Sequence, residues 1–323
     1  MNIGIIGTGR HGSRYAHHIV DDFNDLHLSA IARRSEEGRE QASGWGARHY
    51  RDYRELIESD QVDAVIAAVP PVHNRDIAEW CSRENKPLLL EKPLAVSSSE
   101  GEEIVSTMKK TGTPLTVGQT LRYNPVVGLL RAKLSSQGRL HTFYANQRLE
   151  PSTLQWLDNP DEAGGGITFH IAVHVFDALH YITGLQVRKV LAVCRTCRTE
   201  NLEDMALVQV EMEGGVRGVV DVSKLSASRS GRYEFVCETS QLYGDQIHGY
   251  VDRIEKARTQ RIAQFDAVPT IPLLLERWRS FLLGEGENPV TGEDGLQAIR
   301  VSEACLLSSR EERWVDVPQA PPA

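Results

Sequence analysis

The feature that most constrains this chain is a glycine-spaced turn within its first twelve residues. Apolar residues 2–6 lead directly into Gly7-Thr8-Gly9-Arg10-His11-Gly12, and a helical pattern through Tyr15 and Ile19 follows. In such a turn the first glycine permits a tight bend, the second lets the backbone approach a pyrophosphate, and the third lets the helix pack closely. A bare tight turn is the alternative, but the placement between strand and helix favours a dinucleotide site at the helix N-terminus.

Three further apolar runs in the first third of the chain predict a parallel sheet. Residues 26–32, 62–69 and 87–90 are apolar without alternation, and helical patterns such as residues 77–81 lie between them. Continuous apolar strands separated by helices are typical of a parallel sheet that is covered on both faces. We therefore expect residues 1–120 to form an α/β domain, a Rossmann-type doubly wound parallel sheet that binds a dinucleotide.

The sequence pattern changes after about residue 120. The runs 139–150, 187–198, 205–213 and 216–225 alternate more and are joined by short turns, which is typical of antiparallel strands. Helices are expected after Gly164-Gly165-Gly166 and near residues 272–283 and 292–309. Because 323 residues exceed the usual size of one domain, residues 121–323 are predicted as a C-terminal α+β domain with a largely antiparallel sheet, which serves substrate binding and oligomerisation.

Charge and composition exclude several classes of partner. A formal net charge of -8 argues against a nucleic-acid or anionic-membrane binder. No charged segment precedes a long apolar stretch, so neither a signal peptide nor a membrane span is readable, and a cytoplasmic location is expected. Five scattered cysteines make no disulfide framework, and the lone Cys194-x-x-Cys197 pair supplies only half of a zinc site. We expect a small polar ligand and no metal.

The residues about 20 positions beyond the glycines bear on the choice of cofactor. NAD-specific sites usually place Asp or Glu there, where it binds the ribose 2'-hydroxyl, whereas this chain has Arg33-Arg34-Ser35. Two arginines and a hydroxyl suit a 2'-phosphate. The sequence therefore favours NADP(H), with NAD(H) as the alternative. The other interpretation is a solvated basic turn balanced by Glu36 and Glu37.

Two groups are candidates for the chemistry. Lys92 lies just past the carboxyl end of the run 87–90, where open α/β sheets bind ligands, and it could donate to a substrate oxygen. His170, His174 and Asp177 are spaced to share one helix face, and a histidine can accept the proton of a hydroxyl. The alternatives are a surface lysine, a core histidine or a zinc pair. The zinc pair is disfavoured because the glutamate of His-Glu-x-x-His is missing.

These motifs together resemble the glucose-fructose oxidoreductase and inositol dehydrogenase family, Gfo/Idh/MocA, over nearly the whole chain. The motifs are the glycine turn, Pro70-Pro71-Val72-His73, Glu91-Lys92-Pro93, residues 118–125, the three glycines leading to His174-Val175-Phe176-Asp177, and Glu293-Asp294-Gly295. The resemblance implies an NAD(P)-dependent dehydrogenase or reductase that moves hydride reversibly between the cofactor and a hydroxyl or carbonyl of a sugar, cyclitol or similar polar substrate. Lys92 would polarise the oxygen and His174 would move the proton.

One departure from the family concerns His170. Family members usually carry aspartate four residues before the histidine, whereas this chain has His170 there. Whether His170 or His174 is the acid/base is therefore open. Two other function classes also remain, an NAD-dependent glycoside hydrolase with transient oxidation and a non-catalytic nucleotide-binding regulator. Family members are commonly oligomers, so a homodimer or homotetramer is expected.

The predicted site residues fall into three sets. The catalytic set is Lys92, His174 and His170. The cofactor-binding set is Gly7, Thr8, Gly9, Arg10, His11, Gly12, Arg33, Arg34, Ser35, Val69, Pro70, His73, Glu91, Lys92 and Gln119. The substrate-binding set is Lys92, Arg122, Tyr123, Trp156, His170 and Asp177, with Arg148 as a weaker candidate and interdomain packing as the other interpretation of Arg122 and Tyr123.

Overall fold

The chain forms two compact units in a computed structural model that describes residues 1–319. The first unit comprises Met1–Gln119 and Pro269–Leu296, and the second comprises Thr120–Val268 and the chain from Gln297 onward. The segment 269–296, which the sequence analysis assigned to the second domain, lies in the first unit. It does so because the apolar stripe of its helix, which includes the fully buried Trp278, packs there.

The first unit is built on a six-stranded parallel sheet in the order β3-β2-β1-β4-β5-β6. The chain reverses its direction of winding between β1 and β4, which brings the carboxyl ends of these strands together at the usual ligand-binding crevice of such sheets. Every residue of β4 and β5 is buried, as the continuous apolar runs predict. The strands are β1 Asn2–Ile6, β2 His27–Ala32, β3 Arg48–Tyr50, β4 Ala64–Ala67, β5 Leu88–Leu90 and β6 Leu115–Val117.

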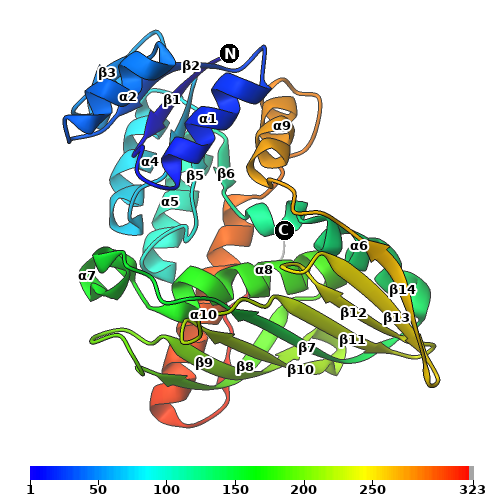
Figure 1. Cartoon of the computed structure of the whole chain (residues 1–323). Coiled ribbons are helices and arrows are strands. Elements are labelled where there is room, and N and C mark those ends of the chain that lie inside the picture. The colour runs from blue at the N-terminus through cyan, green and yellow to red at the C-terminus, as the bar shows by residue number, and fades with distance from the viewer. Residues whose placement is uncertain (320–323) are drawn as a thin grey trace. The chain divides into compact units, whose positions relative to one another are not determined.

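Helices cover both faces of this sheet (Figure 1). α1 packs against α9, and α4 packs against α5. Arg279 of α9 forms an ion pair with Asp25, just after α1. The helices of this unit are α1 Gly12–Asp22, α2 Glu37–Trp45, α3 Tyr53–Glu58, α4 Asn74–Arg83, α5 Ser98–Thr111 and α9 Ile271–Leu282, with a short 3-10 helix at Pro71–His73.

The second unit contains a nine-stranded sheet in the order β14-β13-β12-β11-β7-β10-β9-β8-β15. All neighbouring pairs are antiparallel except β7 and β10, which run parallel. The prediction of a largely antiparallel sheet is therefore confirmed. The strands are β7 Leu140–Arg148, β8 Val187–Arg195, β9 Met205–Met212, β10 Arg217–Ser223, β11 Arg232–Cys237, β12 Gln241–Asp245, β13 Tyr250–Glu255, β14 Arg258–Gln264 and β15 Val315–Asp316.

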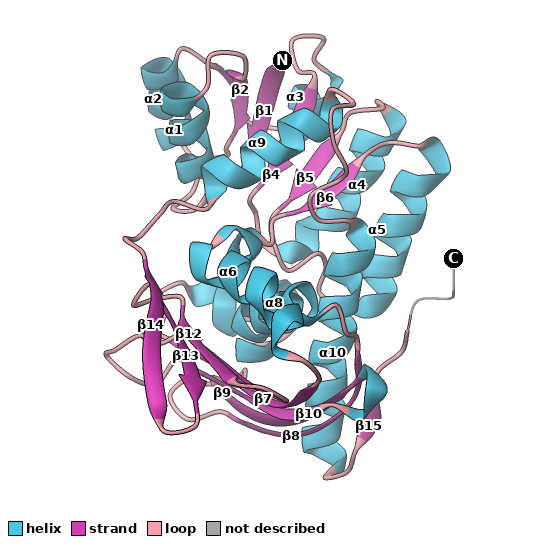
Figure 2. Ribbon diagram, turned by 90° about the vertical axis from the view of Figure 1, so that its right-hand side faces the viewer, coloured by secondary structure: helices cyan, strands magenta, loops and turns pink. Residues whose placement is uncertain are grey.

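One face of this sheet is buried under helices (Figure 2). Residues of β9 alternate between buried and more exposed positions, and the buried side chains join those of α6 and α8 in one apolar core. The helices are α6 Pro125–Leu134, α7 Pro160–Ala163, α8 Val173–Thr183 and α10 Gly292–Glu311, whose first residues belong to the other unit. Among residues 1–319, no helix combines the length and apolar character needed to cross a membrane.

Candidate cofactor site and active site

The glycine turn has the backbone that a dinucleotide site needs. Gly7 has φ +85°, and a Cβ on it would lie 2.6 Å from the carbonyl oxygen of Ala68. A Cβ on Gly12 would lie only 1.9 Å from the carbonyl oxygen of Gly7. At Gly9, in contrast, nothing lies within 4 Å of that position. The outer glycines are therefore required by the fold, whereas the middle glycine leaves open space before the N-terminus of α1, which fits a pyrophosphate.

Arg33 ties the glycine turn to its neighbours. Its Nη1 donates to the carbonyl oxygen of Thr8 at 2.8 Å and to Gln41 Oε1 at 3.0 Å. Its Nε donates to Ser35 Oγ at 2.9 Å, and its Nη2 pairs with Glu37. The hydroxyl of Thr8 also donates to Gln41 Oε1, at 2.6 Å. The guanidinium of Arg33 is therefore engaged in holding the turn, together with Gln41, which the sequence analysis did not single out.

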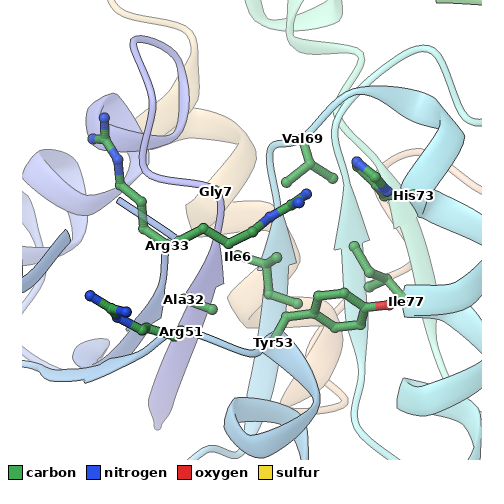
Figure 3. A pocket seen from close by; sticks show the side chains of 10 residues that line it. Ile6, Gly7, Ala32, Arg33, Arg51, Tyr53, Val69, His73 and Ile77 are labelled. Carbon is green, nitrogen blue, oxygen red and sulfur yellow. The ribbon is translucent and has the colours of Figure 1, made fainter. Parts of the chain in front are cut away.

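A pocket of about 140 Å³ lies beside this turn. Figure 3 shows Val69 and His73 on the side of the pocket opposite Arg51. Arg34 also lines the pocket. The full lining is Ile6, Gly7, Ala32, Arg33, Arg34, Arg51, Tyr53, Val69, His73 and Ile77. Several predicted cofactor residues from separate strand ends therefore meet in one pocket.

Five pocket residues were missed from the sequence, the apolar Ile6, Ala32 and Ile77 and the polar Arg51 and Tyr53. Arg51 and Tyr53 follow β3, and a strand of three residues has no periodicity that a sequence pattern could reveal. Arg51 forms an ion pair with Glu36. Arg10 of the glycine turn is exposed and is not among the residues that line the pocket. The pocket thus has cationic side chains from two strand ends, β2 and β3.

Glu91 is a buried carboxylate at the end of β5. Its Oε1 lies 2.9 Å from His11 Nε2 and accepts a hydrogen bond from the Tyr15 hydroxyl at 2.5 Å. Its Oε2 accepts from the backbone N–H of Lys92 at 3.1 Å. Burial raises the pKa of Glu91, but His11, Lys92 and Tyr15 outweigh burial and leave the pKa below its ordinary value. Tyr15 was missed as a site residue, although it stands four positions after His11 and so on the same side of the helix.

Lys92 lies two residues beyond β5, as predicted, and its side chain is partly buried. Burial lowers its pKa, and the negative charge of Glu91 offsets part of this effect. A lysine of this kind gives up its proton more readily than an exposed lysine. Gln119, at the end of the first segment of this unit, is buried, and Pro70 precedes the short helix that carries His73.

In the second unit, the helix that carries the two histidines begins irregularly. Thr168–Ala172 is a π-helical turn, and α8 continues from it. A helix is therefore present after the three glycines, as predicted, but the turn that contains His170 is π-helical and not α-helical. His170 is buried, and His174 is partly buried on α8. Such π turns occur frequently at functional sites.

Glu203 holds the start of this π turn. Its Oε1 accepts hydrogen bonds from the N–H of Gly166 at 2.9 Å and from the N–H and hydroxyl of Thr168 at 3.1 Å and 2.5 Å. A Cβ on Gly166 would lie 2.0 Å from the carbonyl oxygen of Glu203. Trp156 lies edge-on to the His170 ring, with 5.2 Å between centroids. These contacts bring two predicted residues, Trp156 and His170, together.

Arg122 and Asp177 bind each other. Arg122 Nε donates to Asp177 Oδ2 at 2.9 Å, and Nη2 donates to Oδ1 at 2.6 Å. Both side chains are at least nine-tenths buried. This geometry is that of a structural ion pair. The substrate contacts predicted for these two residues would have to be made in addition to it. Tyr123 lies beside Arg122 in a 3-10 helix and is partly buried. Arg148 binds Asp221 and the Tyr144 hydroxyl.

Metal ligands are not gathered anywhere in the part of the chain that the structure describes. Residues 1–319 contain no group of three or more His, Cys, Asp or Glu side chains with the arrangement to hold a metal ion. All five cysteines lie in this range, and none is in a disulfide.

Comparisons with known proteins agree with this geometry. A family model described as an oxidoreductase family with an NAD-binding Rossmann fold matches residues 1–119. The model of the GFO/IDH/MocA C-terminal domain matches residues 137–243. The chain is 26% identical to myo-inositol 2-dehydrogenase of Thermotoga maritima over 98% of each chain. It is 25% identical to D-apiose dehydrogenase of Paraburkholderia graminis, over 84% of this chain and 77% of the other.

Solved structures show the same fold. The structure of levoglucosan dehydrogenase in complex with NADH matches with a TM-score of 0.89 at 20% identity, and it covers 99% of this chain and 100% of the other. Both family models, the full-length relatives and the fold agree with the motifs read from the sequence, and the predicted resemblance is confirmed. The chain belongs to the GFO/IDH/MocA oxidoreductase family.

Proposed function

We propose that this protein is an NAD(P)-dependent oxidoreductase that moves hydride reversibly between the cofactor and a hydroxyl or carbonyl group of a sugar, cyclitol or similar polar molecule. The observation that carries the proposal is the position of Lys92. It follows the carboxyl end of β5 and has a lowered pKa, in the same unit as a glycine turn with open space for a pyrophosphate. Full-length relatives named as inositol dehydrogenases support the substrate class.

Each site residue has a defined part in this reaction. The bound cofactor would supply or accept the hydride at its nicotinamide ring. Lys92 donates a hydrogen bond to the reacting oxygen and stabilises negative charge that develops there. His174 accepts the proton of the substrate hydroxyl in oxidation and returns it in reduction. His170, with its ring against Trp156, is the alternative acid/base.

The lysine is tested by substitution. Lys92→Ala is expected to lower kcat by about 100-fold or more, since loss of one donor that stabilises developing negative charge costs roughly 10²–10³-fold, with little change in the Kd of NADH. Turnover is followed as nicotinamide absorbance with inositols, aldoses and uronic acids. Lys109→Ala on α5 is the matched control and keeps full activity. Unchanged turnover in Lys92→Ala on an identified substrate would contradict the proposal.

The same assay distinguishes the roles of His170 and His174. In the single variants His170→Asn and His174→Asn, the acid/base is the residue whose loss removes the dependence of kcat on pH. We assign this role to His174, and loss of the dependence in His170→Asn alone would reassign it.

For the cofactor, we propose a preference for NADP(H), with NAD(H) as the alternative. Its support is that Arg34 and Arg51 both line the pocket, while Arg33 is engaged with the glycine turn. Relatives include a scyllo-inositol 2-dehydrogenase (NADP(+)) of Bacillus subtilis. Arg34→Ala and Arg51→Ala are each expected to raise the Kd of NADPH about tenfold and to leave the Kd of NADH unchanged, since hydrogen bonds to charged groups contribute about 1.5–3 kcal/mol.

Arg39→Ala is the control for the cofactor test, because Arg39 also pairs with Glu36 but does not line the pocket. Tighter binding of NADH than of NADPH by the wild type, with a ratio that neither pocket variant changes, would contradict the NADP(H) preference.

We also propose that the protein is a homo-oligomer. Val193 and Leu207 face each other across β8 and β9, and Val219 lies on the adjacent β10. All three are exposed although they are apolar. A second copy would cover this face of the sheet. Leu207→Lys is expected to lower the mass measured by light scattering to that of a monomer, and an unchanged mass would exclude this face.

A further inference from the structure

The carboxylate of Glu91 links two parts of the first unit that have different tasks. One part is the glycine turn, whose last residue before α1 is His11. The other is the end of β5, which leads into Lys92. Glu91 Oε1 contacts His11 and Tyr15, while Oε2 contacts the backbone N–H of Lys92. One side chain therefore joins the phosphate end of the site to its catalytic lysine.

The fold reserves space for this carboxylate. A Cβ on Gly118 would lie 2.8 Å from Glu91 Oε1, and only glycine leaves that space free. Tyr15, which is itself fully buried, donates the second hydrogen bond to the same oxygen. The position of the carboxylate is thus fixed from the α1 side and from the side of the loop after β6.

His11 is the partner of this carboxylate that carries an imidazole, a group that can be neutral or protonated. Its side chain is 45% exposed, whereas that of Glu91 is 8% exposed. The first turn of α1 contains no acidic residue and no side-chain cap. A proton on the imidazole therefore adds positive charge to a helix N-terminus that already favours anions, and it strengthens the hydrogen bond to Glu91.

We infer that His11 is a positioning residue that couples cofactor binding to proton binding, with Glu91 holding its ring at the glycine turn. A protonated His11 attracts the pyrophosphate and keeps its contact with Glu91. The neutral form keeps its contact with Glu91 but does not attract the pyrophosphate by charge. Because binding favours the protonated form, the protein takes up protons as it binds cofactor, and its affinity falls as pH rises.

Two other groups of this unit can contribute to a pH dependence of cofactor binding, Lys92, whose pKa is lowered, and His73, which lines the pocket. In the cluster around His11, Glu91 and Lys92 interact from the end of β5, and Tyr15 does so from α1. Arg10 and Arg14 flank His11 in the sequence and add guanidinium groups beside it. His73 lines the pocket. The experiment therefore includes a His73 variant, which measures the contribution of this histidine to the pH dependence.

The test measures NADH binding by calorimetry from pH 6 to 9. NADH is the probe because it lacks the 2'-phosphate, which titrates in this range. Two buffers with different ionisation enthalpies give the number of protons taken up. For the wild type, the Kd is expected to rise about fivefold over this range, as for one unit charge acting through a high dielectric near the protein surface, with proton uptake on binding.

Four variants give the expected pattern. His11→Asn binds NADH with a nearly constant Kd and little proton uptake. Glu91→Gln retains a pH dependence, because His11 is still present at the glycine turn. His18→Asn is the matched control on α1, where His18 contacts Asp22, and it behaves as the wild type. His73→Asn keeps most of the wild-type dependence.

The outcomes are distinguishable. A wild-type Kd that does not change with pH overturns the inference, as does full proton uptake in His11→Asn or loss of the uptake in His73→Asn alone. Circular dichroism establishes that each variant is folded, and His11→Gln serves if His11→Asn is not. The inference rests on the proposed cofactor site, and a wild type that binds neither NADH nor NADPH at any pH would instead refute that site.

Discussion

Arg122 and Asp177 form a bidentate ion pair that water barely reaches. Removing one partner of a buried pair leaves the other charge without compensation, which costs about 3–5 kcal/mol. We expect Asp177→Asn to lower the free energy of unfolding by about 3 kcal/mol for this reason, measured by urea denaturation. The exposed pair of Arg75 and Glu103 is the control, and Glu103→Gln is expected to have no measurable effect. A loss in Asp177→Asn no larger than in the control would show that the buried pair is not structural.

Asp245 makes the stability of the second unit dependent on pH. Burial raises the pKa of this carboxyl, but the His248 side chain and the backbone N–H groups of His248 and Ile247 outweigh burial and lower it. A lowered pKa means that the stabilisation is fully present above the unfolded-state value, about 3.9, and is lost as pH falls through the folded-state value.

The pH prediction for Asp245 is tested by thermal unfolding. We expect the Tm to fall as the pH drops below about 4, and we expect Asp245→Asn to have a lower Tm at pH 7 but a smaller change on acidification. Equal acid sensitivity in the variant and the wild type would assign the effect to other carboxylates.

At the scale of elements, the turn between β1 and α1 contains two kinds of glycine. Gly7 and Gly12 are needed for folding, whereas Gly9 is needed for binding. Gly12→Ala places a methyl group 1.9 Å from the carbonyl oxygen of Gly7, so it should lower the Tm and abolish NADH binding. Gly9→Ala meets no atom within 4 Å, so it should keep the wild-type Tm and still weaken NADH binding at least about tenfold by blocking the backbone approach.

Gly44→Ala on α2 is the control for the glycine variants, since it also meets no atom within 4 Å but lies outside the turn. It should change neither NADH binding nor, beyond a small gain from helix propensity, the Tm. NADH affinity that survives in Gly9→Ala would count against a pyrophosphate at this turn.

The predictable elements were those with a long or continuous apolar pattern. β1, β4 and β5 follow from runs whose residues are buried, except Asn2 at the start of β1, and the helix α10 falls within two residues of its expected bounds. β3 and β6 have three residues each, too few for a period to appear. The π turn at Thr168–Ala172 depends on Glu203, more than thirty residues away in the chain, so local pattern could not reveal it.

The candidate site was predictable to the same extent. Lys92 and the glycine turn could be predicted because local sequence features define them. Lys92 follows the end of a strand, and the glycines of the turn have a characteristic spacing. The contact between Tyr15 and Glu91 spans 76 residues of sequence, and the engagement of Arg33 with Thr8 spans 25. Such contacts arise only once the sheet brings its strand ends together, so the sequence indicated the residues but not which of them bind each other.

At the scale of the whole molecule, the chain completes its first unit late. Residues 269–296 return to it after the second unit has begun, and they pair with its edge through Val117 N–H and the carbonyl oxygen of Val290 at 3.0 Å. α9 buries Leu274, Leu275 and Trp278 in the same unit.

A fragment of residues 1–119 is therefore expected to aggregate. The same fragment joined by a flexible linker to residues 269–296 should be monomeric and bind NADH, as gel filtration and calorimetry would establish. A stable, monomeric 1–119 fragment would contradict this.

The return of α9 also governs how the protein can emerge from the ribosome. The glycine turn and Lys92 are synthesised within the first hundred residues, yet the helix that packs on α1 is translated only after residue 270. For most of its synthesis the nascent chain would carry an incomplete nucleotide-binding half with an uncovered apolar flank, a natural client for chaperones. Folding of that half and ability to bind cofactor should then arise together, after about nine-tenths of the polypeptide has been made.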